Sequence, residues 1–397
     1  MNKQAIQLIL RGAVNKVGNM LYDYGNNIWL ASLGGLGQTV LGIYQMSDLI
    51  TSILFNPFGG VVSDRISRRK ILLVTDLICA ILCLGISFLT SDTWLVAGLI
   101  IANIVQAICF AFSRPANKAY VTEVVNKEEI IIYNARLEMV LQIVSVSAPI
   151  LSFIVLHFTD LRMTLRLDAL SFFLAFLLVV SLPDREEPIK IPEKMTVSLV
   201  LQDMKEGFLY ILYKKDIFFL LVMASAVNFF YAAFNYLLPF SDQLYKTSGA
   251  YALILTTGAL GAILGSLLAR KVKNKMQTLL LALVMSGLGI VLMGQSLPLV
   301  FIYMGNFISE GFMAIFNIHF FTQVQTKVED AYLGRVLSTI YTLAILLMPL
   351  ATALMTILPS VHVWSLTVIG LGIILLSVTG LGIVHRFFDR KKVENEK

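Results

Sequence analysis

Charged residues are scarce in this sequence of 397 residues: Asp, Glu, Lys and Arg together make up only 14% of it. A soluble globular domain has about 25% charged and roughly 45–50% apolar residues. Here 57% of the residues are hydrophobic and the mean hydropathy is +0.79. This composition excludes an ordinary water-soluble enzyme and predicts a helical protein that crosses a membrane several times.

Cysteine and histidine are also rare, with three and four residues. The cysteines lie inside apolar runs and the histidines are far apart, so the sequence offers neither a disulfide framework nor the ligand spacing of a zinc site. It also lacks the phosphate-loop, H-E-x-x-H and G-x-S-x-G patterns of nucleotide-binding proteins and hydrolases. We therefore expect no metal, no cofactor and no enzymatic activity.

Twelve apolar windows are each long enough for a membrane-spanning helix, which needs about 20 residues. They cover residues 10–33, 39–62, 71–90, 93–112, 136–157, 164–182, 217–240, 249–269, 276–296, 298–320, 336–358 and 361–384. The net charge of +6 comes from basic clusters between these windows, so we expect no nucleic-acid partner. The clusters fall in alternate loops, which by the positive-inside rule places both termini in the cytoplasm. The expected fold is an all-α polytopic membrane protein with twelve transmembrane helices.

The longest polar interruption divides the chain into two halves of six spans. We expect an N-terminal bundle at residues 1–182, a cytoplasmic linker with an amphipathic helix at 183–216, and a C-terminal bundle with a short basic tail at 217–397. The linker begins with charged, proline-containing sequence and continues with apolar residues at helical spacing. The loop sequence near Gly60 aligns with that near Gly265, which predicts that the halves are pseudo-repeats.

A run of basic residues follows the second span, in the order Gly60-Val-Val-Ser-Asp64-Arg65-Ile-Ser67-Arg68-Arg69-Lys70. It resembles the signature that major facilitator transporters carry between their second and third spans, except that Ser67 replaces a glycine. Charge-assisted hydrogen bonds between such residues can form in one conformation and break in another. We interpret the run as a conformational latch; the alternative is a generic basic cytoplasmic loop. The latch residues are Gly60, Asp64, Arg65, Arg68 and Arg69.

Stretches throughout the chain resemble the macrolide-efflux branch of the drug:proton antiporters in the major facilitator superfamily, which has siderophore exporters as relatives. Among these stretches are RPANKAYVTEVV, LDALSFFLAFLL, TTGALGAILGSLL and AYLGRVLS. The resemblance implies two six-helix bundles with a substrate site between them. It also implies a bacterial plasma-membrane antiporter that confers antibiotic resistance by proton-coupled efflux of an amphipathic molecule, such as a macrolide, through alternating access.

Two positions depart from the family pattern. Gln106 stands where the superfamily often has an arginine in the fourth span, so no coupling role is carried over to it. Ala148 and Pro149 stand where the antiporter signature ends in Gly-Pro. Pro149 can still bend its helix, because proline lacks the backbone donor and crowds the preceding turn.

Polar residues recur every three or four positions within several apolar spans, and each must face protein or water and not lipid. We predict that they line the substrate cavity, because the spans that carry them are the cavity-lining spans that the resemblance implies. Nearby aromatic residues in the seventh and tenth spans favour an amphipathic cargo over a sugar. The predicted cavity residues are Asn15, Asn19, Asn26, Gln45, Ser52, Gln106, Gln142, Asn228, Tyr231, Asn235, Asn306 and Asn317.

Acidic residues near the middle of spans are candidates for proton coupling. A charge at the bilayer centre costs about 2.5–3.5 kcal/mol on insertion scales, and this cost favours loading and release of a proton as hydration changes. Asp23 and Glu310 are the main candidates, one in each half, and Asp48 is the third. The alternative is a fixed hydrogen bond or ion pair, with Lys16 or Arg11 as the partner of Asp23. We expect structural roles for Asp76 and Asp168, as ion-pair or capping residues.

The expected partners are a small-molecule substrate, protons and the lipid bilayer, and we expect a monomer. One alternative keeps the fold and changes the cargo to an endogenous siderophore, peptide or lipid-like metabolite. Another is a membrane sensor that binds its ligand on the same fold without transporting it.

Overall fold

The computed structural model describes residues 3–63, 66–183, 197–358 and 360–386. Throughout these ranges the regular structure is helical, without a strand. The chain divides into two compact units, unit 1 at Met1–Leu201 and unit 2 at Gln202–Lys397. We describe each unit by itself.

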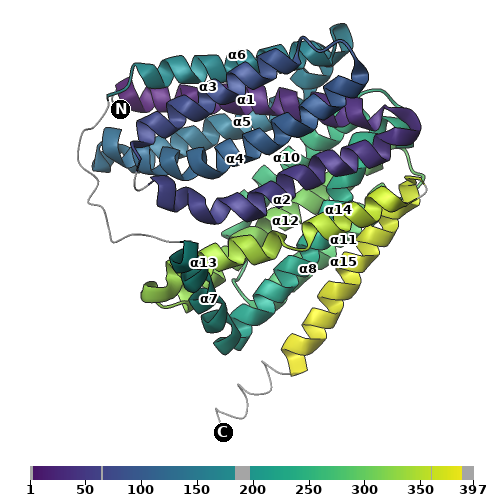
Figure 1. Ribbon diagram of the computed structural model, residues 1–397. Helices are drawn as coiled ribbons and strands as arrows, with labels where there is room; N and C mark the ends of the chain where they lie inside the picture. The colour runs from purple at the N-terminus through teal and green to yellow at the C-terminus, as the bar shows by residue number, and fades with distance from the viewer. Residues whose placement is uncertain (1–2, 64–65, 184–196, 359, 387–397) are drawn as a thin grey trace. The chain divides into compact units, whose positions relative to one another are not determined.

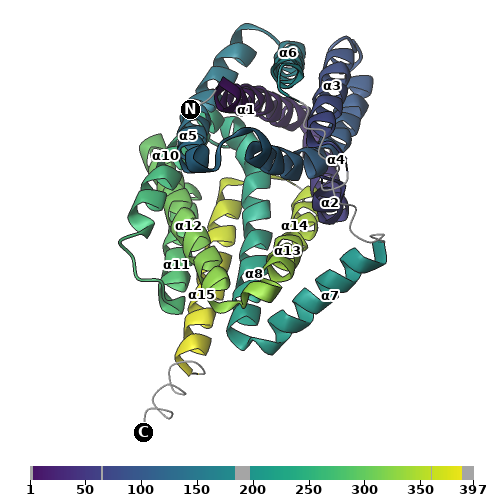
Figure 2. The ribbon, with the colours of Figure 1, turned by 90° about the vertical axis from the view of Figure 1, so that its left-hand side faces the viewer.

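Unit 1 contains six long helices. Helix α1 lies between α5 and α6, while α2 packs on α4 and α3 packs on both α4 and α6 (Figure 1 and Figure 2). Side chains set the starts of two of them: Ser67 caps α3, and the carboxylate of Asp160 accepts a 3.0 Å hydrogen bond from the amide of Met163 at the start of α6. The bounds are α1 Lys3–Ala31, α2 Gly37–Ser63, α3 Arg68–Ile86, α4 Asp92–Val124, α5 Ile130–Phe158 and α6 Leu161–Val180.

Unit 2 contains six helical segments of similar length, two shorter helices that extend them, and most of helix α7. Helix α10 begins after Gly249, whose positive φ of 81° suits glycine. The carboxylate of Asp242 accepts hydrogen bonds of 2.8 Å from the amides of Gly249 and Tyr251 at this start. The bounds are α7 Val197–Tyr213, α8 Lys215–Leu237, α9 Ser241–Leu244, α10 Ala250–Ala269, α11 Met276–Met293, α12 Leu299–Lys327, α13 Asp330–Ile345, α14 Met348–Ile357 and α15 Val363–Val384.

The two units repeat one packing scheme. In unit 1, α1 packs on α5 and α6, α4 packs on α2 and α3, and α3 packs on α6. In unit 2, α8 packs on α13, α14 and α15, α12 packs on α10 and α11, and α11 packs on α15. Each of these main contacts in one unit therefore has its counterpart in the other, as expected of pseudo-repeats of six helices.

All twelve predicted spans fall on helices, and the eleventh falls on two. The break between α13 and α14 comes at Leu346 and Leu347, directly before Pro349 in the first turn of α14, where proline is tolerated. Within the described residues, nine helical segments are long and apolar enough to cross a membrane. Helices α1, α2 and α3 are not among these nine, so their membrane crossing stays a prediction.

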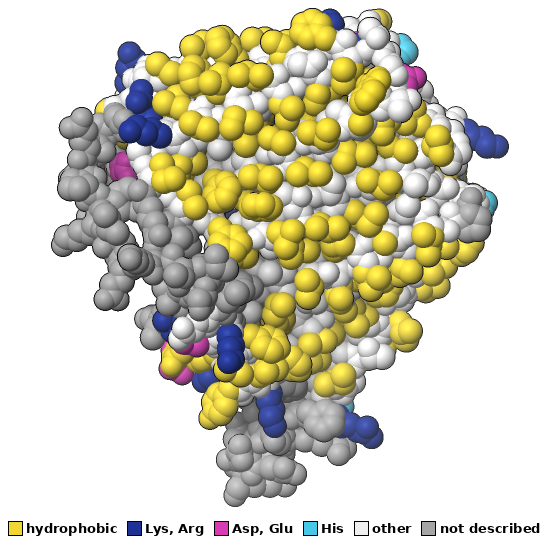
Figure 3. Space-filling view, in the orientation of Figure 1, with side chains coloured by type: hydrophobic (Ala, Val, Ile, Leu, Met, Phe, Trp, Pro, Cys, Tyr) yellow, Lys and Arg dark blue, Asp and Glu magenta, His cyan; other side chains and the backbone are white. Residues whose placement is uncertain are grey.

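Large apolar side chains cover much of the protein's surface. Figure 3 shows hydrophobic side chains spread over one face, with Lys and Arg towards its margins. Ile81 on α3 and Leu375 on α15 are 64% and 67% exposed. Lipid tails provide the environment in which such exposure carries no cost.

Glycines allow α10 and α12 to approach each other very closely. A methyl group added at Gly261 would lie 2.1 Å from the carbonyl oxygen of Phe307, and one at Gly265 would lie 2.0 Å from that of Gly311. In unit 1, a methyl group on Gly59 of α2 would lie 1.9 Å from the carbonyl oxygen of Ala111 on α4. Small residues at helix crossings of this kind bring backbones together inside membranes.

Gly265→Ala should destabilise unit 2 by at least about 1–3 kcal/mol, because the added methyl group meets backbone atoms that cannot move aside. The matched control is Gly382→Ala on α15, where no atom lies within 4 Å of the added methyl group. Thermal unfolding of the purified protein in detergent measures both effects. Equal melting temperatures for the two variants would contradict the close crossing of α10 and α12.

Candidate functional site

Two carboxylates on different helices of unit 1 interact electrostatically. Asp23 on α1 is exposed and Asp48 on α2 is half-buried. The charged groups that act on Asp23 are Asp48, Lys16 and Arg114, and Arg114 also acts on Asp48. Within the described part of the chain, no cation lies within ion-pair distance of either carboxylate. Both acids are therefore available to bind a proton or a cationic group. We call these four residues the Asp23 cluster.

Arg114 of this cluster was not predicted as a site residue. The hydropathy window ended at residue 112, which left Arg114 in a loop, whereas α4 continues to Val124 and carries Arg114 well inside the helix. Its guanidinium carbon lies 5.2 Å from the centre of the Phe110 ring. A cation in this position partly offsets the negative charges of the two carboxylates.

Amide side chains surround the cluster and connect α1, α2 and α4. The amide nitrogen of Asn26 donates to the Tyr44 hydroxyl at 3.1 Å, and that of Gln45 donates to the side-chain oxygen of Asn27 at 3.0 Å. From α4, Asn103 donates to the backbone oxygen of Tyr44 at 2.8 Å. These bonds fix the faces of α1 and α2 that carry Asp23 and Asp48.

The polar stripe of α1 carries buried acceptors that no donor satisfies. The side-chain oxygens of Asn15, Asn19 and Asn26 are buried and have no hydrogen-bond partner among the described residues. An unsatisfied buried polar group costs about 1–3 kcal/mol, and bound water is the usual remedy. The stripe therefore has the chemistry of a hydrated track along α1.

Arg11 pairs with Asp76 and not with Asp23. Its guanidinium donates to both carboxylate oxygens of Asp76 on α3, with the shortest distance 2.9 Å, and also to the side-chain oxygen of Asn117. Arg11 and Asp76 are only 6% and 3% exposed. The prediction that Asp76 pairs with a basic residue is confirmed. The alternative that Arg11 pairs with Asp23 is wrong.

Asp168 lies inside α6 and not at its cap, and no basic residue of the described ranges pairs with it. It is fully buried, and its polar neighbours are the neutral side chains of Cys83, Gln106 and Ser171. The prediction of an ion-pair or capping role for Asp168 is wrong. Gln106 lies in this buried group, where its amide nitrogen is 3.0 Å from the Cys83 sulfur.

In unit 2, Glu310 is half-buried on α12, across from Gly258 of α10. Beside it, Asn306 donates to the backbone oxygen of Ile254 at 2.6 Å. The hydroxyl of Tyr231 on α8 lies 2.6 Å from that of Ser286 and 2.9 Å from that of Ser309, which ties α8 to α11 and α12. As for Asp23, no cation forms an ion pair with Glu310 in the described ranges.

The remaining predicted cavity residues do not form one group within either unit. Asn228 donates to the backbone oxygen of Ala344 at 3.0 Å, and Gln142 donates to Glu138 at 2.8 Å. The cavity role of the whole set stays a prediction. Among its members, Ser52 is half-buried, and Asn235 and Asn317 are exposed.

Two latch residues hold the start of α3 to other helices of unit 1. Arg68 pairs with the carboxylate of Glu123 at the end of α4, and Arg69 donates to the backbone oxygen of Val180 at the end of α6 at 2.7 Å. Gly60 lies in α2, while Asp64 and Arg65 lie outside the described residues. Glu123 is a partner that the spacing of the motif could not identify.

A family model described as the Major Facilitator Superfamily matches residues 17–352. The chain belongs to the major facilitator superfamily. It is therefore a multi-pass membrane protein of a transporter family whose members bind small-molecule substrates. The expected all-helical membrane fold is confirmed, and the count of twelve membrane spans stays a prediction. The orientation of its termini stays a prediction.

Two relatives of this superfamily member share one name. The chain is 26% identical over 337 residues to macrolide efflux protein A of Enterococcus faecalis, a match that covers 79% of this chain and 99% of the relative. It is also 26% identical over 336 residues to macrolide efflux protein A of Streptococcus pyogenes, which covers 79% of each chain.

Solved structures with the same fold are much more distant in sequence. The nucleoside transporter NupG, in a mutant form, matches with a TM-score of 0.75 at 14% identity and covers 97% of this chain and 100% of its own. The peptide transporter POT in complex with sulfate matches with a TM-score of 0.74 at 12% identity, covering 97% and 95%. A bacterial homologue of ferroportin in an inward-facing state matches with a TM-score of 0.72 at 12% identity, covering 96% and 97%. These likenesses establish the fold alone.

Proposed function

We propose that this transporter exports an amphipathic small molecule, such as a macrolide antibiotic, across the bacterial plasma membrane in exchange for protons. The main support is that each unit carries a carboxylate inside a helix that has no ion-pair partner among the described residues, Asp23 in unit 1 and Glu310 in unit 2. The name shared by the relatives supports the choice of cargo.

The acids of the two units link the binding of a proton to the conformation of the transporter in this mechanism. A protonated Asp23 or Glu310 is neutral and tolerates an apolar environment, whereas the ionised form needs water or a cation. Proton binding therefore favours one conformation of the transporter, and proton release favours the other. Arg114 compensates the negative charge of Asp23 and Asp48 in the deprotonated state.

The driving force is sufficient for export without a nucleotide. One proton that moves down about 100 mV yields roughly 2.3 kcal/mol, and one pH unit adds about 1.4 kcal/mol. Together these sustain a gradient of about a few hundredfold for a neutral substrate. Binding of the substrate from the cytoplasm and its release outside would follow alternating access, with both termini cytoplasmic and the protein acting as a monomer.

Reconstitution into proteoliposomes tests the proposal directly. Purified wild type should accumulate a labelled macrolide only when a pH gradient or membrane potential of the correct sign is imposed, and an ionophore should abolish the accumulation. Macrolide accumulation that depends neither on the pH gradient nor on the membrane potential would contradict proton coupling. Binding of the macrolide without any flux would indicate a sensor. Flux of a siderophore or peptide, without flux of the macrolide, would show that the cargo is an endogenous compound.

We propose that the latch of Arg68 and Glu123 stabilises one conformation of unit 1. A partly exposed ion pair contributes about 0.2–1 kcal/mol, so Arg68→Ala should change the turnover of transport by up to about fivefold. Substrate affinity should stay the same, because neither residue is part of the Asp23 cluster. Lys70→Ala is the control, since Lys70 is an exposed cation in the same first turn of α3. Turnover is measured as initial flux in proteoliposomes. Unchanged turnover in Arg68→Ala would contradict the latch hypothesis.

A further inference from the structure

Arg166 is a cation on α6 for which the described part of the chain offers no counter-charge. Its side chain is exposed, and no carboxylate of the described residues lies within ion-pair distance of it. Helix α6 is long and apolar enough to cross a membrane, and Arg166 is its sixth residue, about 8 Å along the axis from its start. The long side chain of an arginine at this depth reaches towards the polar headgroups of the lipids. The position of Arg166 therefore suits an anion that comes from outside the chain.

Neighbouring contacts hold the guanidinium of Arg166 in place. Its central carbon lies 5.8 Å from the centre of the Phe88 ring, which is within the range of a cation–π interaction. Phe88 belongs to the loop after α3, and Arg162 ties this loop to α6 by donating to the backbone oxygens of Leu89 and Thr90 at 2.9 and 3.1 Å. Arg162 is thus already occupied, whereas the N–H donors of Arg166 have no acceptor among the described residues.

An apolar groove between α3 and α6 begins at Arg166. It has a volume of about 380 Å³. Ala80 and Ala169 line it and are only 7% and 5% exposed, so their small side chains leave the room between the larger ones. It extends to Phe173, seven residues beyond Arg166, and therefore follows α6 for about 10 Å, a third of the thickness of the hydrocarbon core. The larger apolar side chains that line it are Leu77, Ile81, Leu84, Leu170 and Phe173.

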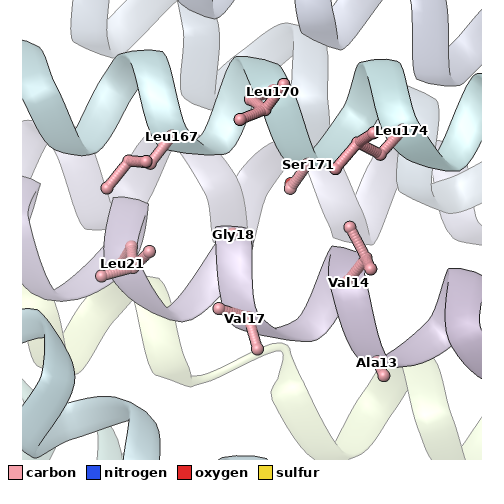
Figure 4. Close-up of a pocket in the computed structure, with 9 residues that line it drawn as sticks. All are labelled: Ala13, Val14, Val17, Gly18, Leu21, Leu167, Leu170, Ser171 and Leu174. Atoms are coloured by element: carbon pink, nitrogen blue, oxygen red, sulfur yellow. The ribbon is translucent and has the colours of Figure 1, made fainter.

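A second apolar groove lies between α6 and α1 (Figure 4). It has a volume of about 290 Å³. Gly18 of α1 lies opposite Ser171 of α6 in it, and a methyl group added to this glycine would lie 1.9 Å from the Ser171 hydroxyl oxygen. Leu170 lines both grooves and is 50% exposed, so it forms a ridge between them, one turn from Arg166. Two apolar grooves thus flank α6 on the side of the ridge that faces away from the headgroup end.

We propose that unit 1 binds one anionic diacyl phospholipid, with the phosphate on Arg166 and one acyl chain in each groove beside Leu170. A guanidinium donates charge-assisted hydrogen bonds to phosphate oxygens in a geometry that matches them well. One unpaired cation next to two apolar grooves corresponds to the build of a molecule with one anionic headgroup and two chains. A ligand with a single chain would leave one groove to other lipids. The proposal requires neither a particular cargo nor proton coupling.

Native mass spectrometry of the full-length protein in detergent tests the headgroup, with dioleoyl phosphatidylglycerol as the probe. Wild type should bind it about fivefold more tightly than dioleoyl phosphatidylcholine, whose choline cation cancels the phosphate charge, because one arginine contributes about that factor to the binding of an anionic lipid. Arg166→Gln should lose this preference, and Arg166→Lys should keep most of it. Equal affinities of wild type for the two lipids, or an unchanged preference in Arg166→Gln, would overturn the proposal.

The matched control is Arg270→Gln, which removes an exposed arginine at the end of α10 in unit 2. It should keep the preference for phosphatidylglycerol. Thermal unfolding gives an independent readout, since a ligand that binds only the folded protein raises its melting temperature. Phosphatidylglycerol should therefore stabilise wild type and Arg270→Gln more than phosphatidylcholine does, and this difference should vanish in Arg166→Gln. A difference of the same size in Arg166→Gln would contradict the site.

Lysophosphatidylglycerol tests the two grooves, because it has the same headgroup and only one acyl chain. It should bind to wild type at least about fivefold more weakly than dioleoyl phosphatidylglycerol, since the contacts along one groove are lost. Equal affinities for the two lipids would show that the second groove holds no chain of the ligand. Inorganic phosphate should not displace the bound lipid; displacement would show an anion site at Arg166 without a lipid site.

Discussion

Asp76→Asn should destabilise the protein by about 3–5 kcal/mol, because it leaves the buried guanidinium of Arg11 without a counter-charge. Arg11 makes its bonds to Asp76 from a position that is 6% exposed, so water cannot replace the lost carboxylate. Thermal unfolding in detergent, or the fraction of monodisperse protein after heating, measures the loss.

Two comparisons make this prediction specific to the buried pair. Asp160→Asn keeps the cap of α6 but removes the charge that pairs with Arg162 in a more exposed ion pair with a 3.6 Å separation, and loss of such a pair should cost less than about 1 kcal/mol. The double change Arg11→Met with Asp76→Leu should recover much of the stability, since an apolar pair of similar volume needs no counter-charge. A melting temperature of Asp76→Asn equal to that of wild type would show that the pair is not formed.

Asp23→Asn and Glu310→Gln should each abolish the proton-driven accumulation of substrate while preserving substrate counterflow. Both changes keep the shape of the side chain and remove its titration. The expected loss is the whole gradient of about a few hundredfold that one proton can sustain. Proteoliposomes with an imposed pH gradient measure it, together with the alkalinisation or acidification that accompanies each transported molecule.

The control for these variants is Asp92→Asn, which changes an exposed acid at the start of α4. It should transport like wild type. Full proton-driven flux in both Asp23→Asn and Glu310→Gln would disprove their coupling role and direct attention to Asp48, the third acid of the same type. Loss of counterflow as well as accumulation would show that the acids bind substrate.

Hydropathy was a good guide to the helices of this protein, because spans in lipid must be both apolar and internally hydrogen-bonded. It was a poor guide to where they end. Helix α4 runs twelve residues beyond its predicted window, to Val124, since polar residues outside the bilayer continue a helix as well as apolar ones do. The break between α13 and α14 follows from Pro349, a local signal that an average over 20 residues hides.

The partners of the charged residues were harder to predict, because they depend on which helix faces meet. Arg11 and Asp23 are twelve residues apart on one helix, which separates them by about 18 Å along the axis and about 120° around it. Helical geometry alone therefore excluded their pairing. No sequence pattern, however, indicated that Arg11 would meet Asp76 on α3, or that Asp168 would meet only neutral groups.

The candidate acids themselves were identified from the sequence, because a carboxylate in an apolar span is conspicuous. The sequence did not predict that Asp23 and Asp48 interact. Asp23 and Asp48 act on each other, and Arg114 of α4 acts on both, only because of the way in which α1, α2 and α4 pack. Long-range packing of this kind carries no signal in a single sequence.

The three cysteines, Cys79, Cys83 and Cys109, are no more than 5% exposed, and all belong to unit 1. Membrane-impermeant maleimide reagents should therefore leave the native protein unlabelled. Two cysteines introduced at exposed positions would then be the only labelled residues, without prior removal of the natural thiols. Distance measurements between the two labels during turnover thus become possible in a protein whose Asp168 environment, including Cys83, is still intact.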